Sequence, residues 1–167
     1  GNGGSFPRTL PSLMTRLTLH WLHVVVLLGA VQGLFLTAAL FTKRRNRTAN
    51  RLLAALMLAF SVFLAHAIYL AAALVPRVPH FFGVAYPLPF LFGPLVYLYA
   101  VAAADRTRRF RARDALHFLP FVATVMAGLP IYMMSGPEKV ALLDHVQAGG
   151  TPPLVIRVAA PPVAGRV

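Results

Sequence analysis

The stretch KRRNRTANRLLAALMLAFSVFLAHAIYLAAALV, residues 43–75, joins a dense group of cations to a long apolar run. Within it, residues 52–75 carry no Asp, Glu, Lys or Arg and include twelve Leu, Ile, Val or Phe side chains. A helix of about 20 apolar residues spans the hydrocarbon core of a bilayer, which is roughly 30 Å thick. Transfer of these side chains into lipid outweighs the cost of burying one His and one Ser. Residues 52–75 therefore predict a membrane-spanning helix.

The whole chain has the composition of a membrane protein. Of its 167 residues 58% are hydrophobic and 12% are charged, and 16 Lys and Arg face only 4 Asp and Glu. Soluble domains are instead about half apolar and a quarter charged. Uncharged runs recur along the chain and predict four spans, at about residues 19–42, 52–75, 81–104 and 115–134. The predicted fold of residues 17–137 is an all-α bundle of four transmembrane helices.

The third predicted span is rich in proline, with Pro87, Pro89 and Pro94. Proline lacks a backbone N–H and clashes with the preceding helical turn. We therefore expect this helix to be broken or kinked, with its freed carbonyl groups satisfied inside the bundle.

Ten of the 16 cations lie in two alternate connections between the predicted spans, and Arg77 stands alone in the connection between those two. The ten are Lys43, Arg44, Arg45, Arg47, Arg51, Arg106, Arg108, Arg109, Arg111 and Arg113. Cytoplasmic loops carry an excess of Lys and Arg, so both connections are predicted to be cytoplasmic and the N-terminus to be outside. There the cations would contact anionic lipid headgroups. Nucleic-acid binding by the first connection is disfavoured because no aromatic side chains are interleaved with its cations.

The two ends of the chain are expected to lie outside the bundle. Residues 1–16 are rich in Gly, Pro and Ser and predict a disordered leader. Residues 138–167 predict an extracytoplasmic loop or a truncated tail, because paired prolines prevent a full span. At the start of this segment, PEKVALLDHV could form a short interfacial helix with Pro137 and Glu138 in its first turn.

No pattern in the sequence indicates an enzyme, a cofactor or a metal site. The absence of Cys excludes thiolate chemistry, and phosphate-binding, nucleophile-elbow and HExxH motifs are missing. His20 and His23 could offer two nitrogens to a metal, but beside Trp21 they fit an aromatic belt at the membrane surface better. Asp114 and His117 form the one candidate catalytic pair, and at this spacing such residues more often orient their neighbours.

Polar residues inside the predicted spans are candidates for packing or for signal recognition. His66 lies past the middle of the second span, where an ionisable group indicates function by default, although a neutral imidazole bonded to a neighbouring helix is the simpler interpretation. Gln32 lies next to Gly33, and Gly29 with Gly33 gives a GxxxG spacing that allows close helix approach. Gln32 is therefore more typical of a packing face than of a ligand contact.

Three segments in order, LLGAVQGLFLTAALFTKRRNRTANRLLAALMLAFSV, YPLPFLFGPLVYLYAVA and RRFRARDALHFLPFV, carry a resemblance to a known family. They resemble the N-terminal membrane domain of bacterial membrane-anchored AraC-family transcriptional regulators, over about residues 27–143. The more specific pieces are Gln32-Gly33, residues 46–53, Gly93-Pro94 followed by Tyr97 and Tyr99, and the His117 to Pro120 stretch. Similar sequence segments occur in membrane domains that are joined to other signalling output domains.

The resemblance implies a signal-sensing bundle of commonly about seven helices in the bacterial inner membrane, followed by a cytoplasmic helix-turn-helix module. Residues after 143 offer no such module, so the chain is expected to be a fragment that would reach DNA only through a missing C-terminal part. An unknown signal ligand and a homodimer are the implied partners. The candidate sensing or packing residues are Gln32, Gly33, His66, Pro87, Pro89, Gly93, Pro94 and His117. A transporter or channel fragment is the competing interpretation, disfavoured because no carboxylate lies inside a span.

Overall fold

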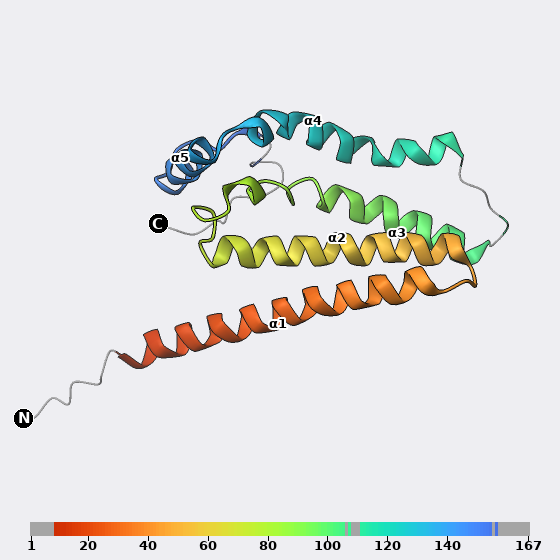
Figure 1. Cartoon of the computed structure of the whole chain (residues 1–167), viewed down its shortest axis with the longest axis horizontal. Helices are drawn as coiled ribbons and strands as arrows, with labels where there is room; N and C mark the ends of the chain where they lie inside the picture. Colours follow the sequence, from red (N-terminus) through yellow and green to blue (C-terminus); the bar gives the residue numbers. More distant parts are fainter. Residues whose placement is uncertain (1–8, 106, 108–110, 155, 157–167) are drawn as a thin grey trace, which may run out of the picture.

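The computed structural model describes the backbone of residues 9–105, 107, 111–154 and 156, and the side chains from residue 21 onward within these ranges. All regular secondary structure in this part is helical (Figure 1). The elements are α1 (Thr9–Thr42), α2 (Arg47–Ala71), the 3-10 helix η1 (Pro79–Phe81), α3 (Pro89–Ala104), the 3-10 helix η2 (Ala112–Phe118), α4 (Leu119–Met133) and α5 (Gly136–Gln147).

Three helical segments of the described residues are long and apolar enough to cross a membrane. They are Trp21–Thr42, Arg47–Ala71 and Ala112–Met133, the last combining η2 with α4. The third predicted span corresponds to α3, a shorter apolar helix of 16 residues. The predicted all-helical membrane class is thus supported by three full-length candidates and one short helix.

The first two helices form an antiparallel hairpin in which the C-terminal part of α1 packs against α2, whereas the N-terminal part of α1 diverges from α2 and extends past its end (Figure 1). Their backbones approach closely at Gly33, which lies against Ser61 and 3.3 Å from the Met57 carbonyl oxygen, measured from the position a Cβ would take. The Thr37 hydroxyl lies 2.8 Å from the Gly33 carbonyl of its own helix and 3.3 Å from the Ala54 carbonyl of α2. The turn between the helices contains Asn46 in the left-handed conformation, at φ 51°, which asparagine tolerates better than most residues.

The connection from α2 to α3 differs from the sequence prediction. The second helix ends at Ala71 rather than at residue 75, and α3 begins at Pro89 rather than at residue 81. Turns and η1 fill the interval, in which Gly83 adopts φ +86°. Prolines 76, 79 and 87 disfavour helix in this interval, because each removes a helical donor and restricts the preceding residue, and Ala73 leaves the helical conformation just after α2, at φ 51°.

The predicted break therefore lies before α3 and not within it. Pro89 occupies the first residue of α3, where its missing N–H costs nothing. Pro94 lies inside an uninterrupted helix. Its ring leaves the carbonyl of Phe90 without the usual helical donor.

The fourth predicted span, residues 115–134, begins as 3-10 helix and becomes α-helical only at Leu119. The following helix, α5, confirms the helix predicted for PEKVALLDHV, with Pro137 and Glu138 in its first turn. It is attached to the end of α4 by Lys139, which is 1% exposed and donates from Nζ to the Tyr132 carbonyl at 3.3 Å. A positive charge near the carbonyl end of α4 interacts favourably with the dipole of that helix.

The ends of the chain are only partly described. The first helix starts at Thr9 and so includes residues 9–16, which were predicted to belong to a disordered leader. Residues 1–8 and 157–167 lie outside the described part.

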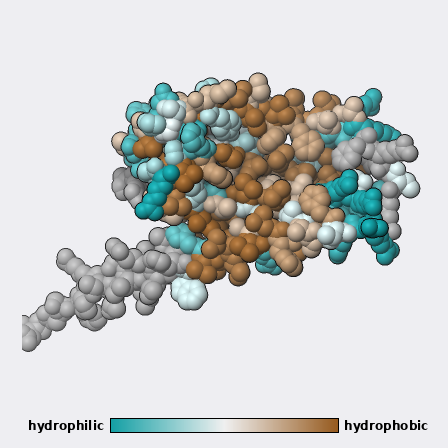
Figure 2. Space-filling view, in the orientation of Figure 1, coloured by the Kyte–Doolittle hydropathy of each residue, from teal (hydrophilic) through white to brown (hydrophobic). Residues whose placement is uncertain are grey.

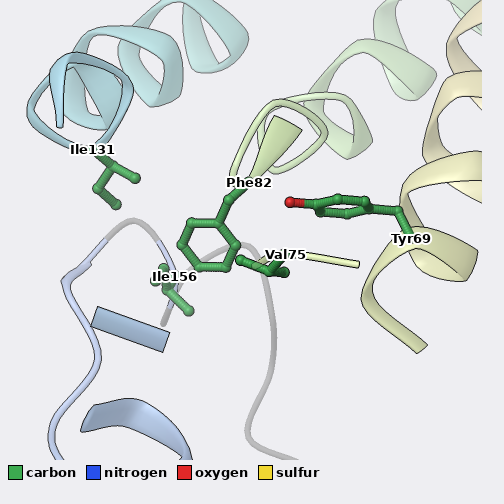
Figure 3. Packing of buried hydrophobic residues seen from close by; sticks show 5 residues of the cluster. All are labelled: Tyr69, Val75, Phe82, Ile131 and Ile156. Carbon is green, nitrogen blue, oxygen red and sulfur yellow. The ribbon is translucent and has the colours of Figure 1, made fainter. Parts of the chain in front are cut away.

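A small core closes one end of the molecule, away from the basic turns. It contains Tyr69 of α2, Val75 and Phe82 of the connection, Ile131 of α4 and Ile156 (Figure 3). Because these residues come from distant parts of the sequence, the cluster fixes the α2–α3 connection against α4.

The outer faces of α1 and α4 are strongly apolar. Phe35 of α1 is 73% exposed and Met133 of α4 is 84% exposed. Figure 2 shows hydrophobic side chains across the middle of one face and hydrophilic ones toward the ends. Apolar surface of this extent marks a membrane or protein contact, and together with the long apolar helices it indicates a membrane protein.

Candidate functional site

A cavity of about 330 Å³ lies between the end of α2 and the α2–α3 connection. Its lining is apolar except for one imidazole and one phenol: Val62, Ala65, His66, Tyr69, Val78, Phe81, Val84 and Ala85. Pockets of about 300 to 1,000 Å³ with a few placed polar groups are typical of small-molecule sites. The cavity is therefore the candidate functional site.

His66 supplies the polar feature of this cavity. It is 6% exposed, and its Nε2 atom is buried with no hydrogen-bond partner among the described residues. Its ring is 5.6 Å from that of Tyr69 and 5.6 Å from that of Tyr86, centre to centre. The simpler sequence interpretation, an imidazole bonded to a neighbouring helix, is thus not what the structure shows at Nε2.

Tyr69 holds the wall of the cavity in place. Its hydroxyl donates to the Val78 carbonyl at 2.7 Å and so joins α2 to the connection that it faces. Its ring also packs near Phe81, at 6.2 Å. In Figure 3 the hydroxyl points away from α2 toward the segment that carries Phe82. One end of α2 therefore provides both the imidazole and the anchor for the opposite wall.

The polar side chains that line this site are one imidazole and one phenol. The eight lining residues include no carboxylate, thiol or amine, and the Tyr69 hydroxyl already donates to a backbone carbonyl. An acid/base mechanism would need a second titratable group within hydrogen-bond reach of the same substrate. One imidazole in an apolar cavity instead offers one oriented hydrogen bond.

The cations predicted to face the cytoplasm gather at the opposite end of α2. Lys43, Arg44, Arg47 and Arg51 line a polar depression of about 220 Å³ with Phe41 and Thr42. Arg45, Arg111 and Arg113 are exposed, whereas Arg106, Arg108 and Arg109 lie outside the described residues. The Asn46 amide donates to the Ala102 carbonyl near the end of α3 at 3.2 Å, so the two basic connections begin at the same end of the molecule.

The other residues singled out from the sequence do not join the cavity. Gln32 is exposed on α1, and Gly33 belongs to the interface with α2. Pro87 is buried before α3 and Pro89 begins it. Gly93 is exposed on α3, where an added Cβ would meet nothing within 4 Å.

The Asp114 and His117 pair lies in η2, far along the chain from the cavity. The Asp114 carboxylate accepts a hydrogen bond from the Arg111 backbone N–H at 2.9 Å and so organises the first turn of η2. The His117 ring meets Tyr97 of α3 edge-on at 4.9 Å. The first contact lies within the start of η2, and the second joins η2 to α3.

The described residues contain no cluster of side chains that could hold a metal ion. No group of three or more His, Cys, Asp or Glu side chains there is arranged to hold a metal ion. His23 is partly buried on α1, and the side chain of His20 lies outside the described part.

Sequence reasoning found His66 but missed its surroundings. Tyr69 follows His66 by three residues, a spacing that places both on one helix face. That signal was available in the sequence. The positions of Val78, Phe81 and Ala85 were not, because they depend on how the proline-rich connection turns back over α2.

Comparison with family models, curated proteins and solved structures finds no match to this chain.

Proposed function

We propose that this chain is the membrane-embedded, signal-sensing domain of an AraC-type transcriptional regulator. The His66 cavity carries the sensing part of the proposal, because its volume and its apolar lining with one buried imidazole are typical of small-molecule sites. The three segments that resemble the family carry the regulator part. A membrane domain joined to another signalling output would have the same site and is distinguished only by its output.

The proposed topology has four spans in the bacterial inner membrane, with α3 as the short third one. Its support is that the α1–α2 turn meets the end of α3 through Asn46 and Ala102, so both basic connections lie at one end. An excess of cations on one side of a membrane marks the cytoplasmic face. The N-terminus and the cavity end of α2 then lie toward the outside.

Signal transmission would use the connection between α2 and α3. This segment forms one wall of the cavity, and Val75 and Phe82 within it pack against Ile131 of α4. A molecule in the cavity that favours one packing of this segment would shift α4 and whatever follows it. A coupling of about 1–3 kcal/mol between two such states is the usual range.

Regulation of transcription requires a DNA-binding module outside residues 1–167. Four spans from an external N-terminus leave residue 136 onward outside, so an odd number of further spans must precede a module that reaches DNA. The gene sequence beyond Val167 tests this directly. We expect further apolar segments and a helix-turn-helix region in the same reading frame; a reading frame that continues into a different output domain would overturn the regulator assignment.

A further inference from the structure

We infer that the His66 cavity binds a neutral, mostly apolar small molecule with a single hydroxyl group, such as a phenol or a short-chain alcohol. This inference rests on the proposed sensing function and names the class of its signal. The ligand would reach the site from the lipid rather than from the cytoplasm.

The size of the cavity sets the size of the ligand. A dry apolar cavity of about 150 Å³ accommodates benzene, and the His66 cavity has about 330 Å³. A benzene ring with a short alkyl chain therefore fits, as does an alcohol of comparable length.

The lining excludes charge. Six of the eight lining residues are Val, Ala or Phe, and an ion transferred into such surroundings loses hydration that these side chains cannot replace. No cation lines the cavity, and Arg77, which precedes the lining residue Val78, is exposed. A neutral molecule avoids this cost.

The Nε2 atom of His66, which has no hydrogen-bond partner among the described residues, selects a hydroxyl. Burying a polar atom without a hydrogen bond costs free energy. A ligand that supplies the missing hydrogen bond therefore binds more tightly than its apolar contacts alone would allow. Neutral imidazole can present Nε2 either as a donor or as an acceptor, and a hydroxyl can complement both forms. His66 is also held between Tyr69 and Tyr86, so its nitrogen is oriented before the ligand arrives.

The rim of the cavity indicates how the ligand enters. Val78, Phe81 and Val84 line the cavity and are 46%, 55% and 42% exposed. An apolar rim beside the end of a membrane helix offers a path for molecules that partition into lipid. A further helix of a longer protein is the competing occupant of this rim.

Binding can be measured on the full chain in lipid nanodiscs with two probes of the same skeleton. Para-propylphenol carries the hydroxyl and propylbenzene lacks it. Selective ¹⁵N labelling of histidine reports the imidazole signals, with the His66 signal assigned from its loss in His66→Leu. We expect saturable binding of para-propylphenol that shifts the His66 signal, and binding of propylbenzene that is about 3- to 10-fold weaker, the value of one buried hydrogen bond.

Three variants separate the contribution of the hydrogen bond from that of the cavity. His66→Leu should abolish the preference for the phenol and keep the binding of propylbenzene. Ala65→Phe, at an exposed lining position, should weaken both probes at least 10-fold. Ala67→Phe adds the same ring to an exposed position of α2 outside the lining and should change neither.

Several results would overturn the inference. Probe uptake equal to that of empty nanodiscs would do so, as would saturable binding that Ala65→Phe leaves unchanged. Cross-linking of the rim to another helix of a longer protein would assign the cavity to packing. Failure of the proposed function is distinguishable, because a protein with another output domain can still bind the phenol through His66.

Discussion

At the residue scale, Gly83 determines the shape of the cavity wall. Its φ of +86° is a backbone conformation that residues with a side chain rarely adopt. Its carbonyl accepts a hydrogen bond from the Tyr132 hydroxyl of α4 at 3.2 Å. This one residue thus allows the connection to turn over α2 and also ties it to α4.

Replacing Gly83 should destabilise the fold more than replacing another glycine nearby. We expect Gly83→Ala to cost about 1–2 kcal/mol, the usual penalty of a left-handed residue with a Cβ. Gly93→Ala is the matched control, since Gly93 is exposed within α3 and a Cβ there meets nothing within 4 Å. It should be neutral or stabilising by up to about 1 kcal/mol. Thermal unfolding in bicelles measures the stability of both variants. Equal stabilities of Gly83→Ala and Gly93→Ala would show that a side chain at position 83 does not strain the backbone.

Glu138 is the second residue with a defined local role. Its carboxylate accepts hydrogen bonds from the Ser135 backbone N–H at 2.7 Å and from the Ser135 hydroxyl at 2.8 Å. Both bonds favour the charged form and hold the pKa of Glu138 below its ordinary value of 4.5. The carboxylate also lies in the first turn of α5, where a negative charge is favourable.

The start of α5 should therefore respond to acid in a defined direction. Because the folded pKa is lowered, the stabilisation by Glu138 is fully present above pH 4.5 and is lost as the pH falls through the lowered value. We expect the protection of the first-turn amides of α5, measured as the exchange rate relative to the intrinsic rate at each pH, to fall over that interval. Glu138→Gln should remove this change in protection; unchanged protection in the wild-type protein would contradict the prediction.

At the element scale, the α1–α2 hairpin depends on small residues. Gly33 lies against Ser61 of α2, which is 2% exposed, and Thr37 bridges to the Ala54 carbonyl. Apolar burial gives little drive for association between helices in lipid, so close backbone packing and interhelical hydrogen bonds must provide it. A larger side chain at Gly33 would remove both contributions.

Gly33→Leu should separate the two helices or force them to shift. Overpacking of this kind costs about 1–3 kcal/mol. Ala38→Leu is the matched control because Ala38 is exposed on the same helix, and we expect it to change stability by less than about 0.5 kcal/mol. Unfolding of both variants in bicelles gives the comparison. Equal losses would mean that added bulk on α1, rather than the contact at Gly33, is responsible.

The helices themselves were accessible from the sequence, whereas their ends were not. Apolar runs between charged groups predict the existence of each long helix, because membrane thickness imposes a minimum length. The end of α2 at Ala71 and the start of α3 at Pro89 depend on local proline geometry. The sequence pattern favoured helix through residues 81–88 because their composition is apolar, but backbone donors rather than hydropathy decide it.

The candidate site was predictable only in part, for a similar reason. His66 was identifiable as a polar residue at depth, since such residues are costly and rare in membranes. The Nε2 atom of His66 has no hydrogen-bond partner among the described residues, whereas the Tyr69 hydroxyl donates to the Val78 carbonyl. Both features depend on the tertiary packing between α2 and the α2–α3 connection. Gln32 has the same pattern in the sequence but is exposed on α1, so polarity alone did not separate a cavity residue from a surface residue.

At the scale of the whole molecule, the two ends differ in chemistry. One end carries the cations around Lys43 and Arg51, and the other carries the small core and the His66 cavity. This difference between the two ends fits a four-span topology only if the short helix α3 crosses the membrane. Its 16 residues extend about 24 Å at 1.5 Å per residue, less than the roughly 30 Å of a hydrocarbon core. The turns before Pro89 would have to complete the crossing, which is tolerated where irregular backbone is buried in protein.

Labelling of single cysteines tests the crossing of α3 directly, because the chain contains no Cys of its own. Thr48→Cys, His80→Cys and Ala112→Cys place thiols at exposed positions in the first turn of α2, in the α2–α3 connection and at the start of η2, without removing a basic residue that sets the orientation. In intact spheroplasts, a membrane-impermeant maleimide should label His80→Cys alone, and the other two only after the membrane is permeabilised. Labelling of Ala112→Cys but not Thr48→Cys would mean that α3 does not cross. Labelling of both would place the basic connections outside, and the cavity would then face the cytoplasm.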